Sequence, residues 1–121
     1  MILNTMTRLV EPDITVVEVS GRMNLGFALS SLEASIKRLI EAGTRKLVID
    51  LSSLDAIDSS GIGLLVSCSG EIEQVGGRMR IGGAHGSVAK ALDVAHLDRI
   101  TPIDSDTETA CRQLAAEGAG V

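Results

Sequence analysis

Aromatic residues are nearly absent from this sequence. Only 1% of its 121 residues are aromatic: Phe27 is the single phenylalanine, and there is no tryptophan or tyrosine. There is thus no tryptophan or tyrosine on which to stack nucleic-acid bases or from which to build an aromatic cage around a ligand. Because hydrophobic residues still make up 45% of the sequence, the core must be built from aliphatic side chains.

Positive charge is also scarce. The chain has 11 basic and 16 acidic residues, which gives a net charge of -5. Binding to nucleic-acid phosphates requires clustered Lys and Arg, and the densest basic stretches here, Arg45-Lys46 and Arg78-Met79-Arg80, are short. The charge balance therefore argues against nucleic acid as the main partner.

Long apolar runs and closely spaced cysteines are missing as well. No stretch reaches the roughly 18–20 apolar residues of a membrane span, and residues 1–10 lack the pattern of a signal peptide. Cys68 and Cys111 have no spacing typical of a metal or redox site, and each falls in an expected helix, where a cysteine acts as a small buried hydrophobe. We therefore expect a cytoplasmic protein without membrane contact, metal or cofactor.

Strand-like and helix-like segments alternate along the chain. β-branched runs such as ITVVEVS at residues 14–20 predict strands, and apolar residues at helical spacing predict helices. The order β-β-α-β-α-β-α-β-α predicts an α/β fold with a mixed, mainly parallel five-stranded sheet and about four helices. We expect strands at residues 5–11, 14–20, 46–51, 78–82 and 99–103, and helices at residues 28–42, 61–75, 87–95 and 105–116, the last capped by Asp104 or Ser105.

One domain accounts for the whole chain. Its length suits a single core, and no linker, internal repeat or low-complexity segment interrupts it. We expect this domain to cover residues 1–117 and a frayed tail to occupy residues 118–121.

A serine pair stands at the expected start of the second helix, in the segment IDSSGIG at residues 57–63. Loops that follow the carboxyl ends of strands are where α/β proteins meet ligands and partners, and residues 52–60 are expected to form such a loop. Capping of the helix explains one of the two serines. A helix N-terminus also accepts a phosphate, because its free N–H groups and its dipole favour negative charge. From the residues alone, capping and phosphorylation both remain open.

Catalytic and phosphate-binding alternatives fit less well. A serine hydrolase needs an activated nucleophile, and the Gly-x-Ser-x-Gly pattern does not surround Ser59. A receiver domain with an aspartate phosphoacceptor needs an acidic pair after its first parallel strand, and residues 21–26 hold no acid. The glycine-rich segment at residues 81–87 lacks the Gly-Lys-Ser/Thr ending of a P-loop. We therefore expect a binding protein and not an enzyme.

The sequence resembles the STAS domain family in its stand-alone form, the bacterial anti-anti-sigma factors, also called anti-sigma factor antagonists. The resemblance covers almost the whole chain. It rests on VSGRMN at residues 19–24, LVIDL at 47–51, IDSSGIGLL at 57–65, Gly76-Gly77, and VAKAL at 88–92 followed by Leu97.

The resemblance implies a regulatory switch. Ser59 aligns with the serine that is phosphorylated by an anti-sigma factor with serine kinase activity. The unphosphorylated form would bind that anti-sigma factor and free a sigma factor, and a metal-dependent serine/threonine phosphatase would reset the switch. Asp58 and Ser60 align with the neighbouring acid and hydroxyl residue. Asn24 stands near the phosphoacceptor where the family often has an aspartate.

The second helix is expected to form the centre of the partner interface. Its inward face is predicted to hold Ile62, Leu65, Val66, Ser69 and Ile72. The opposite stripe, which is small and uncharged, consists of Gly63, Ser67, Gly70 and Gln74.

Small residues let a partner approach the helix backbone, so Gly63 and Ser67 are expected to bind the partner. The residues around the phosphoacceptor, Asn24, Asp58, Ser60 and Gly61, complete the expected partner-binding set. We expect the free protein to be a monomer. Two other uses of the module stay open: a scaffold subunit of a stress-signalling complex, and a small cytoplasmic partner of a lipid or solute transporter.

Overall fold

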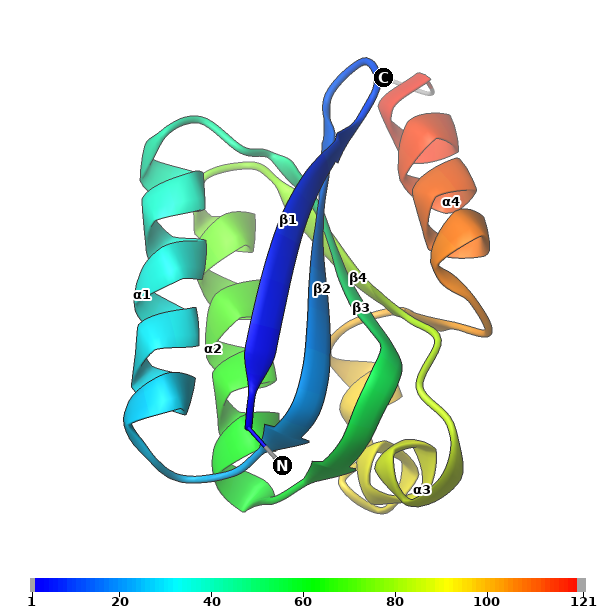
Figure 1. The fold of residues 1–121 in the computed structure, drawn as a ribbon. Coiled ribbons are helices and arrows are strands. Elements are labelled where there is room, and N and C mark those ends of the chain that lie inside the picture. The colour runs from blue at the N-terminus through cyan, green and yellow to red at the C-terminus, as the bar shows by residue number, and fades with distance from the viewer. Residues whose placement is uncertain (1, 120–121) are drawn as a thin grey trace.

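Five strands form one sheet, with helices covering both of its faces (Figure 1). The computed structural model describes residues 2–119. The strands are β1 (Asn4–Val10), β2 (Ile14–Met23), β3 (Lys46–Ile57), β4 (Arg78–Gly82) and β5 (Ile103–Asp104), and the helices are α1 (Phe27–Glu41), α2 (Ser59–Gln74), α3 (Gly86–Val94), the short 3₁₀ helix η1 (Leu97–Arg99) and α4 (Thr107–Ala119).

The strands lie side by side in chain order. β1 runs antiparallel to β2, and β2, β3, β4 and β5 are parallel to one another. The predicted fold class, a mixed and mainly parallel α/β sheet with four helices, is therefore confirmed. No helix among residues 2–119 combines the length and the apolar character that a bilayer span requires.

Two apolar layers enclose the sheet. Alternate residues of a strand point to opposite faces, so Val17 and Ile49 contribute to the large cluster under α1, α2 and α3, whereas Val16 and Val48 pack with Leu114 under α4. The central strands are thus covered on both sides, as their continuous apolar character predicts. Cys68 is part of the large cluster, and burial raises the pKa of its thiol to about 12.

The third strand is longer than the sequence predicted. β3 continues to Ile57 through the segment that was expected to form a loop, and β2 continues to Met23. The two extensions pair with each other, from Ser20 with Ser53 to Met23 with Ile57, with one register shift just before this stretch and one within it. Gly21 lies in this region with a φ of 90°, a conformation that favours glycine. The ladder satisfies the backbone of a segment whose side chains, such as Asp55, are typical of a loop.

The end of the chain also differs from the prediction. A strand was expected at residues 99–103, but η1 occupies Leu97–Arg99 and β5 contains only Ile103 and Asp104. Helix α4 begins at Thr107, and the carboxylate that caps it belongs to Asp106, which accepts a hydrogen bond from the N–H of Thr109 at 2.7 Å.

Neither residue predicted to cap this last helix does so. Asp104 instead forms a largely buried ion pair with Arg80, with 2.7 Å between Nε and Oδ2, and Ser105 precedes the capping residue. Of the expected tail at residues 118–121, the first two residues belong to α4 and the last two lie outside the described residues.

A buried hydroxyl pair joins α2 to the turn that precedes β5. The Thr101 hydroxyl donates to the Ser69 hydroxyl, and both side chains are buried. Thr101→Val keeps the shape of the side chain but removes this donor, so the free energy of unfolding should fall by about 1–3 kcal/mol. The test compares denaturant melts of Thr101→Val, of Ser69→Ala and of the double variant that carries both substitutions. The double variant should cost less than the sum of the single variants, and strict additivity would show that the two hydroxyls do not act as a pair.

Candidate functional site

Helix α2 starts at the edge of the sheet where β2 and β3 end, and Asp58 is its N-cap. One carboxylate oxygen, Oδ1, accepts a hydrogen bond from the N–H of Gly61 at 3.0 Å. The other, Oδ2, accepts from the N–H of Leu25 at 3.1 Å, and the N–H of Asp58 itself donates to the Met23 carbonyl at 3.0 Å. One side chain therefore fastens the β2–α1 connection to the start of α2.

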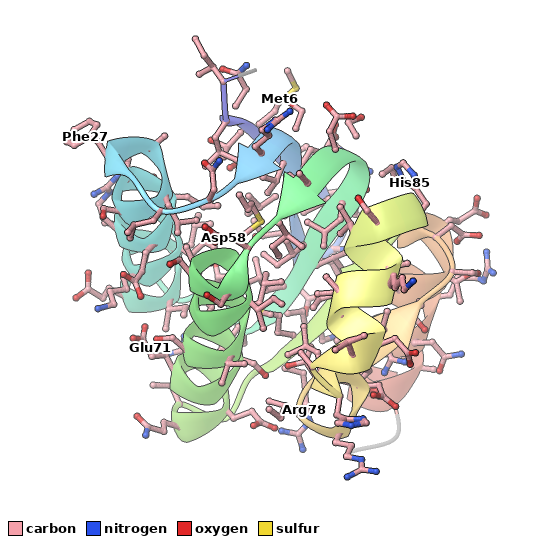
Figure 2. The ribbon with its side chains drawn as sticks, turned by 90° about the horizontal axis from the view of Figure 1, so that it is seen from below. Met6, Phe27, Asp58, Glu71, Arg78 and His85 are labelled. Atoms are coloured by element: carbon pink, nitrogen blue, oxygen red, sulfur yellow. The ribbon has the colours of Figure 1, made fainter. Side chains whose placement is uncertain are left out.

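Figure 2 views this end of the molecule and shows Asp58 at the first turn of α2. Asn24 precedes Leu25 in the connection that Asp58 holds, and its side chain is exposed. The structure thus brings Asn24 to the region of the serine pair, although the two segments are far apart in the sequence.

The electrostatics of Asp58 follow from these hydrogen bonds. The N–H groups of Gly61 and Leu25, in that order of effect, hold the pKa of the carboxyl below its usual value of 3.8. Hydrogen bonds donated to the charged form of a carboxyl favour that form. Asp58 is therefore an ionised structural clamp, and its carboxylate is already engaged with the backbone.

The two serines are left with free hydroxyls. Ser59 is exposed and Ser60 is half-buried. Within residues 2–119, Asp58 is the side chain that caps α2, and neither serine hydroxyl has a hydrogen-bond partner. Helix capping therefore accounts for Asp58 and leaves the serines unexplained. Ser59 presents an accessible nucleophilic oxygen at the first helical position.

Gly61, which was expected to belong to the partner-binding set, is buried in the first turn of α2, and its part in partner binding stays a prediction. A Cβ at this position would lie 2.6 Å from the Met23 carbonyl oxygen and 2.7 Å from Cγ1 of Ile57. The residue is a glycine because α2 approaches the end of β2 closely, and it shapes the site from inside the fold.

The outward stripe of α2 lies on the surface, as predicted. Gly63, Gly70 and Gln74 are exposed, and Ser67 is half-buried. A Cβ at Gly63 or Gly70 would meet no atom within 4 Å. On the inward face Leu65, Ser69 and Ile72 are buried as expected, whereas Ile62 and Val66 are only partly buried. Leu64, which the prediction omitted, and Cys68, which was expected to be buried, complete the buried face.

Two exposed apolar residues flank the site and were not predicted. Leu25 and Phe27 have 81% and 88% of their surface exposed. Both lie where the connection held by Asp58 leads into α1, and Figure 2 shows Phe27 at the start of that helix, at the same end of the molecule as Asp58. A signal was present in the sequence, because the only aromatic residue of the chain stands just before an expected helix and outside its apolar stripe.

A groove lies on the other side of Ser59, between α2 and α3. It has a volume of about 440 Å³ and a mostly apolar lining that includes Ile57, Ile62 and Val94, with Ser59 and Lys90 also lining it. Residues from three elements meet here, so no short motif in the sequence announces the groove.

The model of the STAS domain family matches residues 6–110. The chain belongs to the STAS domain family. A protein of Thermotoga neapolitana that is named as an anti-sigma factor antagonist is 25% identical to this STAS domain over 91 residues, which are 75% of this chain and 80% of the relative.

Solved structures share the fold of this STAS domain. An anti-sigma factor antagonist from Mycobacterium paratuberculosis superposes with a TM-score of 0.84 at 21% identity, covering 93% of this chain and 94% of the other. The unphosphorylated anti-sigma factor antagonist SpoIIAA gives 0.80 at 23% identity, covering 93% and 97%. Its phosphorylated form, from Bacillus, gives 0.72 at 22% identity, covering 91% and 98%. The resemblance inferred from the sequence is confirmed at the level of family and fold.

Two glycines of α2 should respond in opposite ways to the same substitution. Gly61→Ala places a methyl group against the Met23 carbonyl, so the free energy of unfolding should fall by about 1–3 kcal/mol. Gly63→Ala is the matched control: its Cβ meets open space, and the better helix propensity of alanine should raise the free energy of unfolding by up to about 1 kcal/mol. Urea melts measure the free energy of unfolding of both variants. Equal changes in the two variants would show that the close approach of α2 to β2 does not require glycine at position 61.

Asp58→Ala should destabilise the domain in a pH-dependent way. At neutral pH the loss of an N-cap costs about 0.5–2 kcal/mol. Because the folded-state pKa of Asp58 lies below 3.8, its charge stabilises the fold above the unfolded-state pKa, and this contribution is lost as the pH falls through the folded-state value. Unfolding measured from neutral pH to about pH 3 should therefore show the gap between wild type and variant narrowing below about pH 4. A gap of constant size would contradict the assigned role of the charge.

Proposed function

We propose that this STAS domain is an anti-sigma factor antagonist that is switched by phosphorylation of Ser59. The observation that carries the proposal is the free, exposed Ser59 hydroxyl at the first position of α2, behind which Asp58 is already committed to the backbone. The names of the relatives support the same function, and SpoIIAA, which shares the fold, has been solved in both unphosphorylated and phosphorylated forms. The protein acts as a regulatory binding partner in the cytoplasm and performs no catalysis of its own.

The partner is an anti-sigma factor that is also a serine kinase. It binds across the start and outward face of α2, where Gly63 and Ser67 leave the helix backbone accessible. Leu25 and Phe27 supply exposed apolar surface beside the serine, and apolar and aromatic anchors carry much of the energy of protein interfaces. Asn24 and Ser60 contribute polar groups next to the phosphoacceptor. By occupying the anti-sigma factor, the unphosphorylated domain frees a sigma factor.

Phosphorylation reverses this binding. The kinase transfers the γ-phosphoryl group of ATP to Oγ of Ser59; ADP leaves and the hydroxyl proton is released. The new group carries a charge of about -1.5 to -2 at neutral pH. Burying that charge against a surface shaped for a hydroxyl costs desolvation energy, and a loss of about 3 kcal/mol already lowers affinity more than a hundredfold. A metal-dependent serine/threonine phosphatase hydrolyses the phosphate ester and restores the binding form.

The function predicts a specific pattern of labelling and binding. Incubation with the cognate anti-sigma factor and radiolabelled ATP should label wild type and Ser60→Ala but not Ser59→Ala, because the exposed oxygen belongs to Ser59. Calorimetric titration should then show that phosphorylated protein binds the anti-sigma factor at least about a hundredfold more weakly than unmodified protein.

Controls on α2 separate binding from folding in the same titration. Gly63→Leu should block binding by filling the gap over the helix backbone, whereas Gly63→Ala should still bind. Labelling that persists in Ser59→Ala and disappears in Ser60→Ala would move the site to Ser60. Equal affinities of the phosphorylated and unmodified proteins would reject the switch.

A further inference from the structure

The groove between α2 and α3 gives Ser59 a neighbour of opposite charge to a phosphate. Ser59 lines the groove from the start of α2, and Lys90 lines it from α3. The other residues around it, among them Ile57, Ile62 and Val94, are mainly apolar. A charged group on Ser59 would therefore face a mainly apolar lining that holds one cation, Lys90, and one anion, Asp58.

The charged side chains of the groove are Asp58 and Lys90. Asp58 forms no ion pair with Lys90 within residues 2–119, and its two carboxylate oxygens accept from the N–H groups of Gly61 and Leu25. Lys90 is exposed and forms no ion pair within residues 2–119, unlike Lys37 and Lys46, which pair with Glu71 and Asp13. The unphosphorylated fold therefore gives the Lys90 ammonium no ionic partner.

We propose that Lys90 is the phosphate-binding residue of the phosphorylated protein, its ammonium pairing across the α2–α3 groove with the phosphate on Ser59. The inference rests on the proposed phosphorylation of Ser59 and adds the group that receives the product. Lysine suits this role because its ammonium sits on a flexible four-carbon stem and acts as a point charge that phosphates accept readily.

The pairing would extend the effect of the phosphate from Ser59 to the neighbouring α2–α3 groove. A phosphate held by Lys90 lies over the groove and covers apolar residues beside Ser59, so that the serine and the groove are withdrawn from a partner together. The Asp58 clamp needs no rearrangement, since its hydrogen bonds involve neither serine hydroxyl.

The experiment installs phosphoserine at position 59 during translation, through a suppressor tRNA charged with phosphoserine, so no kinase is needed. Phosphorus NMR then follows the phosphate signal through a pH titration of the folded full-length protein. A neighbouring cation favours the dianion, so the second pKa of the phosphate in wild type should lie below that in Lys90→Met. The expected rise on substitution is about 0.2 to 0.7, which corresponds to an exposed ion pair.

Two matched variants identify the charge as the cause. Lys90→Arg keeps the positive charge and should keep the phosphate pKa near the wild-type value. Lys37→Met removes a lysine of α1 that is paired with Glu71, away from the groove, and should leave the phosphate pKa unchanged. The rise in Lys90→Met should also shrink at high salt, because screening weakens an exposed pair.

An unchanged phosphate pKa in Lys90→Met would overturn the assignment of Lys90, as would an equal rise in Lys37→Met. Neither result would bear on the proposed function, which is decided by the labelling of Ser59 and by the affinity for the anti-sigma factor. Conversely, if the anti-sigma factor failed to label Ser59, the proposed function would fall while the titration still measured the pairing, because the phosphate is introduced independently.

Discussion

The two hydrogen bonds that the Asp58 carboxylate accepts hold the functional end of this domain together. A helix begins with N–H groups that have no partner inside the helix, and a connection that leaves a sheet needs an anchor. Asp58 answers both needs, because Oδ1 serves Gly61 in α2 and Oδ2 serves Leu25 in the β2–α1 connection. Gly61 completes the arrangement by letting α2 lie against the Met23 carbonyl. The position of Ser59 at the start of α2 follows from this clamp, and so does that of Leu25, whose N–H the carboxylate holds.

The sequence allowed the order of the elements to be predicted wherever periodicity and packing agree. Strand β4 was predicted to the residue, because glycines mark both of its ends. The prediction failed where long-range backbone pairing overrides side-chain character. Residues 52–57 look like a loop, yet their backbone groups find partners in the extension of β2. The cap of α4 was misplaced for a similar reason: Asp104 is a good capping residue by type, but Arg80 engages it from another strand, and Asp106 takes the role.

The same contrast explains which site residues the sequence could reveal. Asp58 and Ser59 are neighbours in one short segment, so local chemistry is enough to single them out. Lys90 and Phe27 reach the site only through the packing of α3 and of the β2–α1 connection. Nothing in the segment around Lys90 marks it as a member of the site, and the only signal for Phe27 is that a lone aromatic residue stands outside the apolar stripe of its helix. Gly61 was assigned to the partner surface because the sequence alone does not show which atoms surround a glycine in the folded chain. In the folded chain the nearest atoms are those of Met23 and Ile57.

The glycines of α2 differ in whether the fold itself requires them. Glycine inside a helix costs up to about 1 kcal/mol relative to alanine. At Gly61 this cost is required, since a Cβ has no room there, but at Gly63 and Gly70 a Cβ would meet no atom within 4 Å. No contact within the described residues requires glycine at these two exposed positions, which fits the proposed close approach of a partner to α2. A phosphate on Ser59 would obstruct that approach without touching the hydrogen bonds of Asp58, because the serine hydroxyl takes no part in them. Under the proposed function the domain would change what it binds while keeping its fold, because Asp58 fixes the structure and Ser59, the next residue, would carry the phosphate.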